Sequence, residues 1–116
     1  MRFMMLMIPR SYATPGADAV ARMARYNDAL TKAGVLLALD GLHPPSAGTR
    51  VAFAAGKATA TDGPFAESRE VVGGYWLIDV KSKDEAVAWA SRCPAGDGDV
   101  IEVRRVQESS DWKGDV

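Results

Sequence analysis

The sequence predicts a single mixed α+β domain that contains two β-α-β units. Helical periodicity occurs in two separate segments, and a short apolar segment lies on each side of both. A length of 116 residues is enough for one hydrophobic core of ordinary size. With 47% apolar and 25% charged residues, the composition is that of a globular domain and excludes a disordered or fibrous chain.

The first β-α-β unit begins at the N-terminus. Residues 3–8 lack helical spacing and end at Pro9, which predicts a buried strand. From Asp18 onward apolar residues return every three or four positions, so we expect an amphipathic helix, and Gly34 follows where a C-terminal cap belongs. Residues 35–39 are then predicted to form the second strand.

The second β-α-β unit follows a predicted β-hairpin. Residues 51–54 and 58–61 flank a glycine turn and contain few large apolar side chains. Residues 72–80 give the strongest strand signal in the chain, and residues 100–106 supply a last strand. Between these two strands, capping-box spacing that starts at Ser82 predicts a second helix.

This order of elements is typical of the ferredoxin-like fold, a βαββαβ sandwich, here with an inserted β-hairpin. Right-handed crossovers would place both helices on one face of the sheet. Residues 3–8 and 72–80 are apolar on both faces, whereas a half-solvated antiparallel sheet alternates apolar and polar residues. We therefore expect a twofold homodimer packed sheet to sheet. The alternative is a monomer whose tail, with Trp112, folds over the open face.

Charge and reactive-residue counts exclude several classes of function. With 14 basic and 15 acidic residues, the chain has no net field that would attract nucleic acid or an anionic membrane. One cysteine and one histidine cannot build a disulfide framework, a zinc finger or an iron-sulfur cluster within one chain. The apolar run at residues 3–8 is too short for a secretory signal or a membrane span. We expect a cytoplasmic protein in which the unpaired Cys93 packs in the core.

Residues 62–70, with the sequence DGPFAESRE, form the densest polar cluster beside an apolar strand. One interpretation is turn chemistry, in which Asp62 caps local backbone N–H groups. The other is a cleft in which Asp62 and Glu67 act as base or hydrogen-bond acceptor and Arg69 binds an anionic group. Spacing alone leaves both interpretations open.

Three further side chains are candidates for a site. His43 lies in a loop next to two prolines and is either a proton carrier or an ordinary surface residue. Tyr26 and Tyr75 could each point a hydroxyl into the cleft between subunits. Asp62, Glu67 and His43 could together hold a cation, but the sequence offers no metal-ligand set, and we expect no metal or cofactor.

Residues 62–70, followed by VGGYWLI at 72–78, resemble the signature of the YCII-related family, specifically its DGPF-domain branch. Matches at residues 4–7, 33–36 and 85–94 extend the resemblance over residues 1–107, which leaves 108–116 as a polar tail. The resemblance implies the dimeric α/β-barrel form of the ferredoxin-like fold.

The functional implications of the resemblance are limited. Smaller members of the family resemble enzymes with a histidine on the first helix and a nearby aspartate, and hydrolase or dehalogenase-like chemistry has been suspected for them. Here Met23 and Tyr26 occupy that helix face, so this pair cannot be carried over, and the lysine usual in the branch is Arg69. DGPF-type proteins tend to be encoded beside extracytoplasmic-function sigma factors, which implies a regulatory alternative.

Two hypotheses follow. The first is a cytoplasmic homodimer that binds a small anionic or carbonyl-bearing molecule in a cleft between the sheets, with or without catalysis. The second is a noncatalytic regulatory or protein-interaction module, with a possible sigma-factor link. Under the first hypothesis the catalytic candidates are His43 and Asp62, and the ligand-binding candidates are Glu67, Arg69, Tyr26 and Tyr75.

Overall fold

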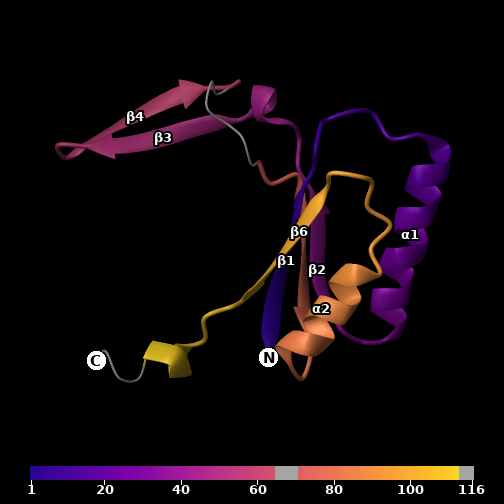
Figure 1. Ribbon diagram of the computed structural model, residues 1–116. Helices are drawn as coiled ribbons and strands as arrows, with labels where there is room; N and C mark the ends of the chain where they lie inside the picture. The colour runs from indigo at the N-terminus through magenta and orange to yellow at the C-terminus, as the bar shows by residue number, and fades with distance from the viewer. Residues whose placement is uncertain (65–70, 113–116) are drawn as a thin grey trace.

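The computed structural model describes residues 1–64 and 71–112, and within them it confirms the mixed α+β class. Figure 1 shows the arrangement of the elements. In chain order they are β1 (Arg2–Ile8), α1 (Ala17–Lys32), β2 (Leu36–Gly41), β3 (Thr49–Ala54), β4 (Lys57–Asp62), β5 (Gly74–Asp79), α2 (Lys83–Ser91) and β6 (Val100–Arg105). Short 3-10 turns occupy Pro45–Ala47 and Ser109–Trp112.

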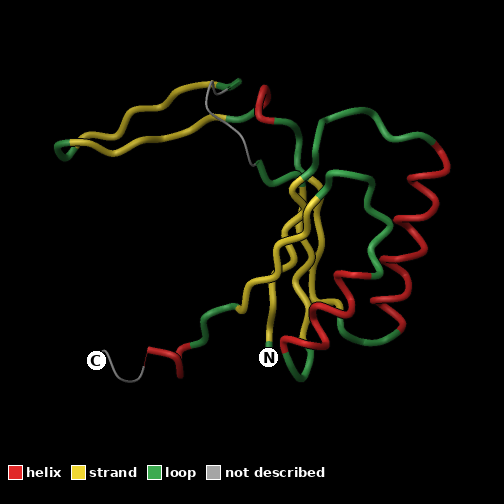
Figure 2. Tube along the Cα trace, in the orientation of Figure 1, coloured by secondary structure: helices red, strands yellow, loops and turns green. Residues whose placement is uncertain are grey.

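A four-stranded antiparallel sheet in the order β2-β5-β1-β6 forms the centre of the molecule. Helix α1 connects β1 to β2, and β5 lies between these two strands in the sheet. Helix α2 connects β5 to β6, and β1 lies between them. This topology is compatible with the predicted ferredoxin-like fold. Both helices lie on the same side of the sheet, as the handedness of such crossovers predicts (Figure 2).

The helix ends are formed by local chemistry that the sequence predicted. Ser82 is the N-cap of α2, and its Oγ accepts a hydrogen bond from the backbone N–H of Glu85 at 3.1 Å. Glu85 in turn accepts from the backbone N–H of Lys81, at 2.9 Å, instead of from the N–H of Ser82. After α1, Gly34 adopts a φ of 73°, a conformation that glycine reaches without steric cost.

The other face of the sheet has no covering layer among the described residues (Figure 2). The register places Met4 opposite Leu77 and Leu6 opposite Tyr75, and these four side chains are only partly buried. Directly opposed residues share one face of an antiparallel pair, so an apolar patch lies on the side away from the helices. The expected two-sided apolar character of these strands is therefore present in the structure.

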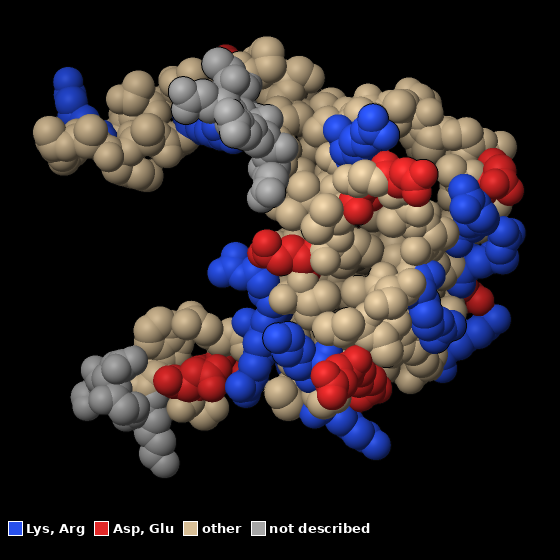
Figure 3. Space-filling view, viewed as in Figure 1, with Lys and Arg blue, Asp and Glu red and all other residues tan. Residues whose placement is uncertain are grey.

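Two segments project beyond this open face. One is the two-stranded antiparallel sheet of β3 and β4, here called the β3–β4 ribbon, and the other is the C-terminal turn Ser109–Trp112 (Figure 1). A hollow lies between them (Figure 3). Trp112 keeps 48% of its surface exposed, so the predicted alternative, in which it covers the open face, is wrong for the described part of the tail. Within residues 1–64 and 71–112, no helix combines the length and apolarity needed to cross a membrane.

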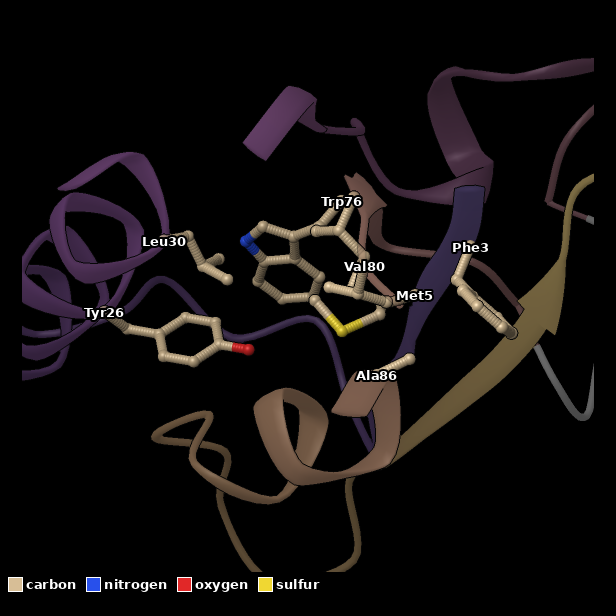
Figure 4. Packing of buried hydrophobic residues seen from close by; sticks show 8 residues of the cluster. Phe3, Met5, Tyr26, Leu30, Trp76, Val80 and Ala86 are labelled. Carbon is tan, nitrogen blue, oxygen red and sulfur yellow. The ribbon is translucent and has the colours of Figure 1, made fainter. Parts of the chain in front are cut away.

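The core lies between the sheet and the helices (Figure 4). Its buried side chains are Phe3, Met5, Tyr26, Leu30, Trp76, Ile78, Val80 and Ala86. The rings of Tyr26 and Trp76 pack edge to face, with centroids 5.8 Å apart and an interplanar angle of 87°. This packing fixes α1 against β5, the strand whose first residues border the candidate site described below.

Candidate functional site

Residues 62–64, the described part of the segment 62–70, lie at the base of the β3–β4 ribbon. Asp62 is the last residue of β4 and pairs with Thr49, whose hydroxyl donates to Asp62 Oδ1 at 2.7 Å. The adjacent Gly63 N–H donates to the carbonyl of Gly48 at 2.8 Å. These contacts are typical of a strand end and agree with the interpretation of this segment as a turn. They differ from it in one respect, because Asp62 accepts from a hydroxyl and not from a backbone N–H. Both Glu67 and Arg69 lie outside the described residues.

His43 and Tyr26 occupy very different environments. His43 is exposed in the loop that follows β2. Tyr26 is buried on the helix-covered side, where its hydroxyl donates to the carbonyl of Trp89 at 2.7 Å and burial raises its pKa above the usual range for tyrosine. The expectation that Tyr26 reaches a cleft between subunits is therefore wrong, because this hydroxyl ties α1 to α2 inside the core.

Tyr75 lies on the open face, the side expected to face a second subunit. Its hydroxyl donates to Oδ2 of Asp40 at 2.6 Å. This hydrogen bond to the carboxylate raises the pKa of Tyr75, so the phenol stays protonated at neutral pH and acts as a donor, not a base. Asp40 was absent from the sequence-based candidates. Its position at the end of a predicted strand, directly before Gly41, could have marked it as a candidate. Nothing in the sequence indicated that it pairs with Tyr75.

A cavity of about 190 Å³ lies beside this pair, between α1 and the adjacent ends of β2 and β5. Its lining consists of Met7, Met23, Asn27, Leu39, Asp40, Gly41, Gly73, Gly74, Tyr75 and Trp76. Most of this lining is apolar, and Asn27 on α1 supplies a polar side chain. Asp40 and Tyr75 border the cavity, but they alternate with Leu39 and Trp76, so their side chains point to the open face of the sheet. A cavity of about 150 Å³ holds benzene, so this space suits a molecule with a similarly small number of heavy atoms.

The glycines keep this end of the sheet tightly packed and free of side chains. A Cβ atom on Gly74 would lie 2.9 Å from the carbonyl oxygen of Asp40. The backbone also closes here through Gly73, whose N–H donates to the carbonyl of Met7 at 2.8 Å and whose carbonyl accepts from the N–H of Leu42 at 2.9 Å. Glycine at positions 73 and 74 therefore accompanies a close approach of the backbones of β2, β5 and β1.

Asn27 connects the cavity to the core. Its Oδ1 accepts a hydrogen bond from the indole Nε1 of Trp76 at 2.8 Å. Because the indole takes Oδ1, the Nδ2 group is the part of this amide that remains to donate to a ligand. Among the described residues that line the cavity, none is Lys, Arg or His. The described site therefore offers an amide donor in an apolar cavity, with the Tyr75–Asp40 pair on the other face of the same strand ends.

Cys93 follows α2 and packs against the core, as expected. Burial, with a smaller contribution from the charge of Asp99, raises the pKa of its thiol to about 11. Among the described residues, no group of three or more His, Cys, Asp or Glu side chains is arranged to hold a metal ion.

Comparison with known proteins gives one family match that spans most of the chain. The model of the YCII-related domain matches residues 1–112. An uncharacterized protein of Rhizobium meliloti (strain 1021) is 41% identical over 59 residues, which are 51% of this chain. The matched part is 48% of that protein, so the similarity extends over about half of each sequence.

Proposed function

This chain belongs to the YCII-related family, and we propose that it is a homodimer that binds a small carbonyl-bearing molecule at the adjacent ends of β2 and β5. The observation that carries the ligand proposal is the small, mostly apolar cavity with the amide of Asn27 at its surface. The resemblance of residues 62–70 to the DGPF branch supports a dimeric α/β barrel, and the lone unpaired thiol of Cys93 suits a cytoplasmic protein.

The dimer proposal is supported by how much surface one chain exposes. The chain exposes 8360 Å², whereas a compact monomer of 12.4 kDa exposes roughly 6100 Å². The excess of roughly 2200 Å² is larger than the roughly 800 Å² that each partner buries in a stable interface of ordinary size. The radius of gyration of 16.7 Å likewise exceeds the roughly 13 Å of a compact 116-residue domain.

The open sheet face supplies the surface for such an interface. Met4, Leu6 and Leu77 form an apolar patch on this face, and Arg104 lies beside Met4. Two sheets that pack face to face lie about 10 Å apart, which removes side chains of this kind from water on both partners. In that arrangement Tyr75 and Asp40, at one end of the sheet, border the space between the subunits.

The polarity of the cavity favours a neutral carbonyl over an anion. The Nδ2 group of Asn27 donates to the carbonyl oxygen of the ligand, and the apolar lining contacts the rest of the molecule. A carboxylate ligand would find no positively charged side chain among the described residues that line the cavity. His43, two residues beyond Gly41, is the proposed proton carrier if the bound molecule is turned over.

Titration of isotope-labelled protein with neutral amides, ketones and aldehydes of three to six carbon atoms tests this proposal, with the corresponding carboxylates as anionic comparisons. We expect the neutral compounds to shift the NMR signals of the Asn27 side-chain amide and of the Gly73 and Gly74 N–H groups. Asn27→Asp keeps the acceptor for Trp76 and removes the donor, so it should weaken binding at least tenfold. The matched control Asp28→Asn alters the neighbouring residue, which pairs with Lys32 outside the cavity, and should leave binding unchanged.

Two results would overturn the ligand proposal. If the carboxylates bind and the neutral compounds do not, the preference for a neutral carbonyl is wrong. If nothing in the panel shifts these signals at millimolar concentration, the cavity is not a site for this ligand class. The noncatalytic interaction module, including a link to a sigma factor, then becomes the better account of the exposed surfaces.

A further inference from the structure

We infer that the β3–β4 ribbon is a dimerisation arm whose apolar face packs on the second copy of this chain. The inference rests on the proposed homodimer, but it concerns a surface separate from the sheet face and the cavity.

The register of the ribbon separates its side chains into two chemically different faces. Val51 pairs with Ala60 and Phe53 pairs with Ala58, so these four residues share one apolar face. On the other face, Arg50 pairs with Thr61, Ala52 with Thr59 and Ala54 with Lys57. Alternation of this kind is typical of a strand pair with one face in water and the other against apolar material.

The apolar face is uncovered in the single chain. Every residue of β3 and β4 is exposed, and Phe53 keeps 80% of its surface and Val51 53%. An isolated two-stranded ribbon is at best marginally stable in water, and packing against another layer is what stabilises such an element. A phenylalanine exposed to this extent is therefore expected to be buried by another molecule.

The position of the ribbon identifies a second copy as that molecule. The ribbon leaves one end of the sheet and runs outward past the open face, on the same side as the C-terminal turn (Figure 1). Each strand of six residues spans roughly 20 Å, about twice the spacing between packed sheets. A copy packed on the open face lies in the hollow of Figure 3, and the ribbon is long enough to pass alongside its sheet.

Phe53 provides the sharpest substitution for a test, because Ala52 beside it points to the opposite face of the ribbon. We expect Phe53→Ser to raise the dimer dissociation constant at least tenfold in sedimentation equilibrium, and Ala52→Ser to leave it within about threefold of the wild-type value. Near-UV circular dichroism of the buried Trp76 would show that each variant keeps its core.

A second measurement separates the arm from the dimer. Hydrogen exchange of the ribbon amides in wild-type protein should slow as the concentration rises through the dimer dissociation constant. A wild-type dimer with an unchanged dissociation constant in Phe53→Ser and rapid ribbon exchange at every concentration would overturn the arm and leave the proposed homodimer intact. A wild-type protein that stays a single chain would overturn both.

Discussion

Gly74 and Gly41 offer a direct test of how the site is built, because they lie opposite each other in the β2–β5 pair. A Cβ atom on Gly74 would lie 2.9 Å from the Asp40 carbonyl oxygen and 3.3 Å from the Gly41 Cα, and both of these atoms belong to the backbone. A Cβ atom on Gly41 would meet nothing within 4 Å. The same chemical change is therefore expected to act in opposite directions on the two sides of one strand pair.

The magnitudes follow from these contacts. Overpacking against backbone costs about 1–3 kcal/mol, and Gly74→Ala recovers only about 0.4–1 kcal/mol from the less flexible unfolded chain. Gly41→Ala should show that gain without the cost. We expect Gly74→Ala to be the less stable variant by about 2 kcal/mol.

Urea unfolding at one fixed protein concentration measures the difference. With an m-value of roughly 1.5 kcal/mol/M, a difference of about 2 kcal/mol separates the two midpoints by more than about 1 M. Equal midpoints for Gly41→Ala and Gly74→Ala would refute the close approach of β2 and β5 at this point. Both glycines border the cavity, so ligand binding by the same two variants also tests whether the cavity depends on this close packing.

Further predictions concern the core, a helix cap and the thiol. Leu30→Ala should lower the free energy of unfolding by about 2–5 kcal/mol, because Leu30 is completely buried, whereas the same change at the half-exposed Leu37 should cost much less in the same urea assay. Ser82→Ala should cost about 1 kcal/mol through loss of the N-cap hydrogen bond of α2, and Ser82→Asp should restore most of it. The Cys93 thiol, with a pKa of about 11 against an ordinary 9.0, should alkylate at pH 8 about 100-fold more slowly in folded than in urea-unfolded protein. Because folding raises this pKa, the protonated thiol contributes its full stabilisation below about pH 9 and loses it as the pH rises towards 11. Equal alkylation rates in folded and urea-unfolded protein would contradict the burial of Cys93.

Periodicity, caps and glycines allowed most of the fold to be predicted from the sequence. Residues 3–8 form most of β1, the helix expected from Asp18 is α1, and the Ser82 cap begins α2. These features are local, because each depends on side chains a few positions apart. Strand order is not local, yet the short connections and the handedness rule allow few arrangements of these elements.

The candidate site was predicted less well because its contacts join residues far apart in the sequence. Alternation separates Tyr75 from the buried Trp76, but it does not reveal that the partner of Tyr75 is Asp40, which lies 35 positions away. Tyr26 was misplaced because an amphipathic helix does not reveal whether a tyrosine at the edge of its apolar face ends in water or in a core hydrogen bond. The donor role of Asn27 depends on Trp76, which is 49 residues away, and no local pattern marks that pair.

Sedimentation equilibrium of the wild-type protein tests the central claim, that one chain is half of the functional unit. The open face, the exposed ribbon and the excess surface predict a mass of twice the 12.4 kDa chain, with dissociation on dilution. A folded protein that keeps the mass of one chain up to millimolar concentration would contradict the homodimer.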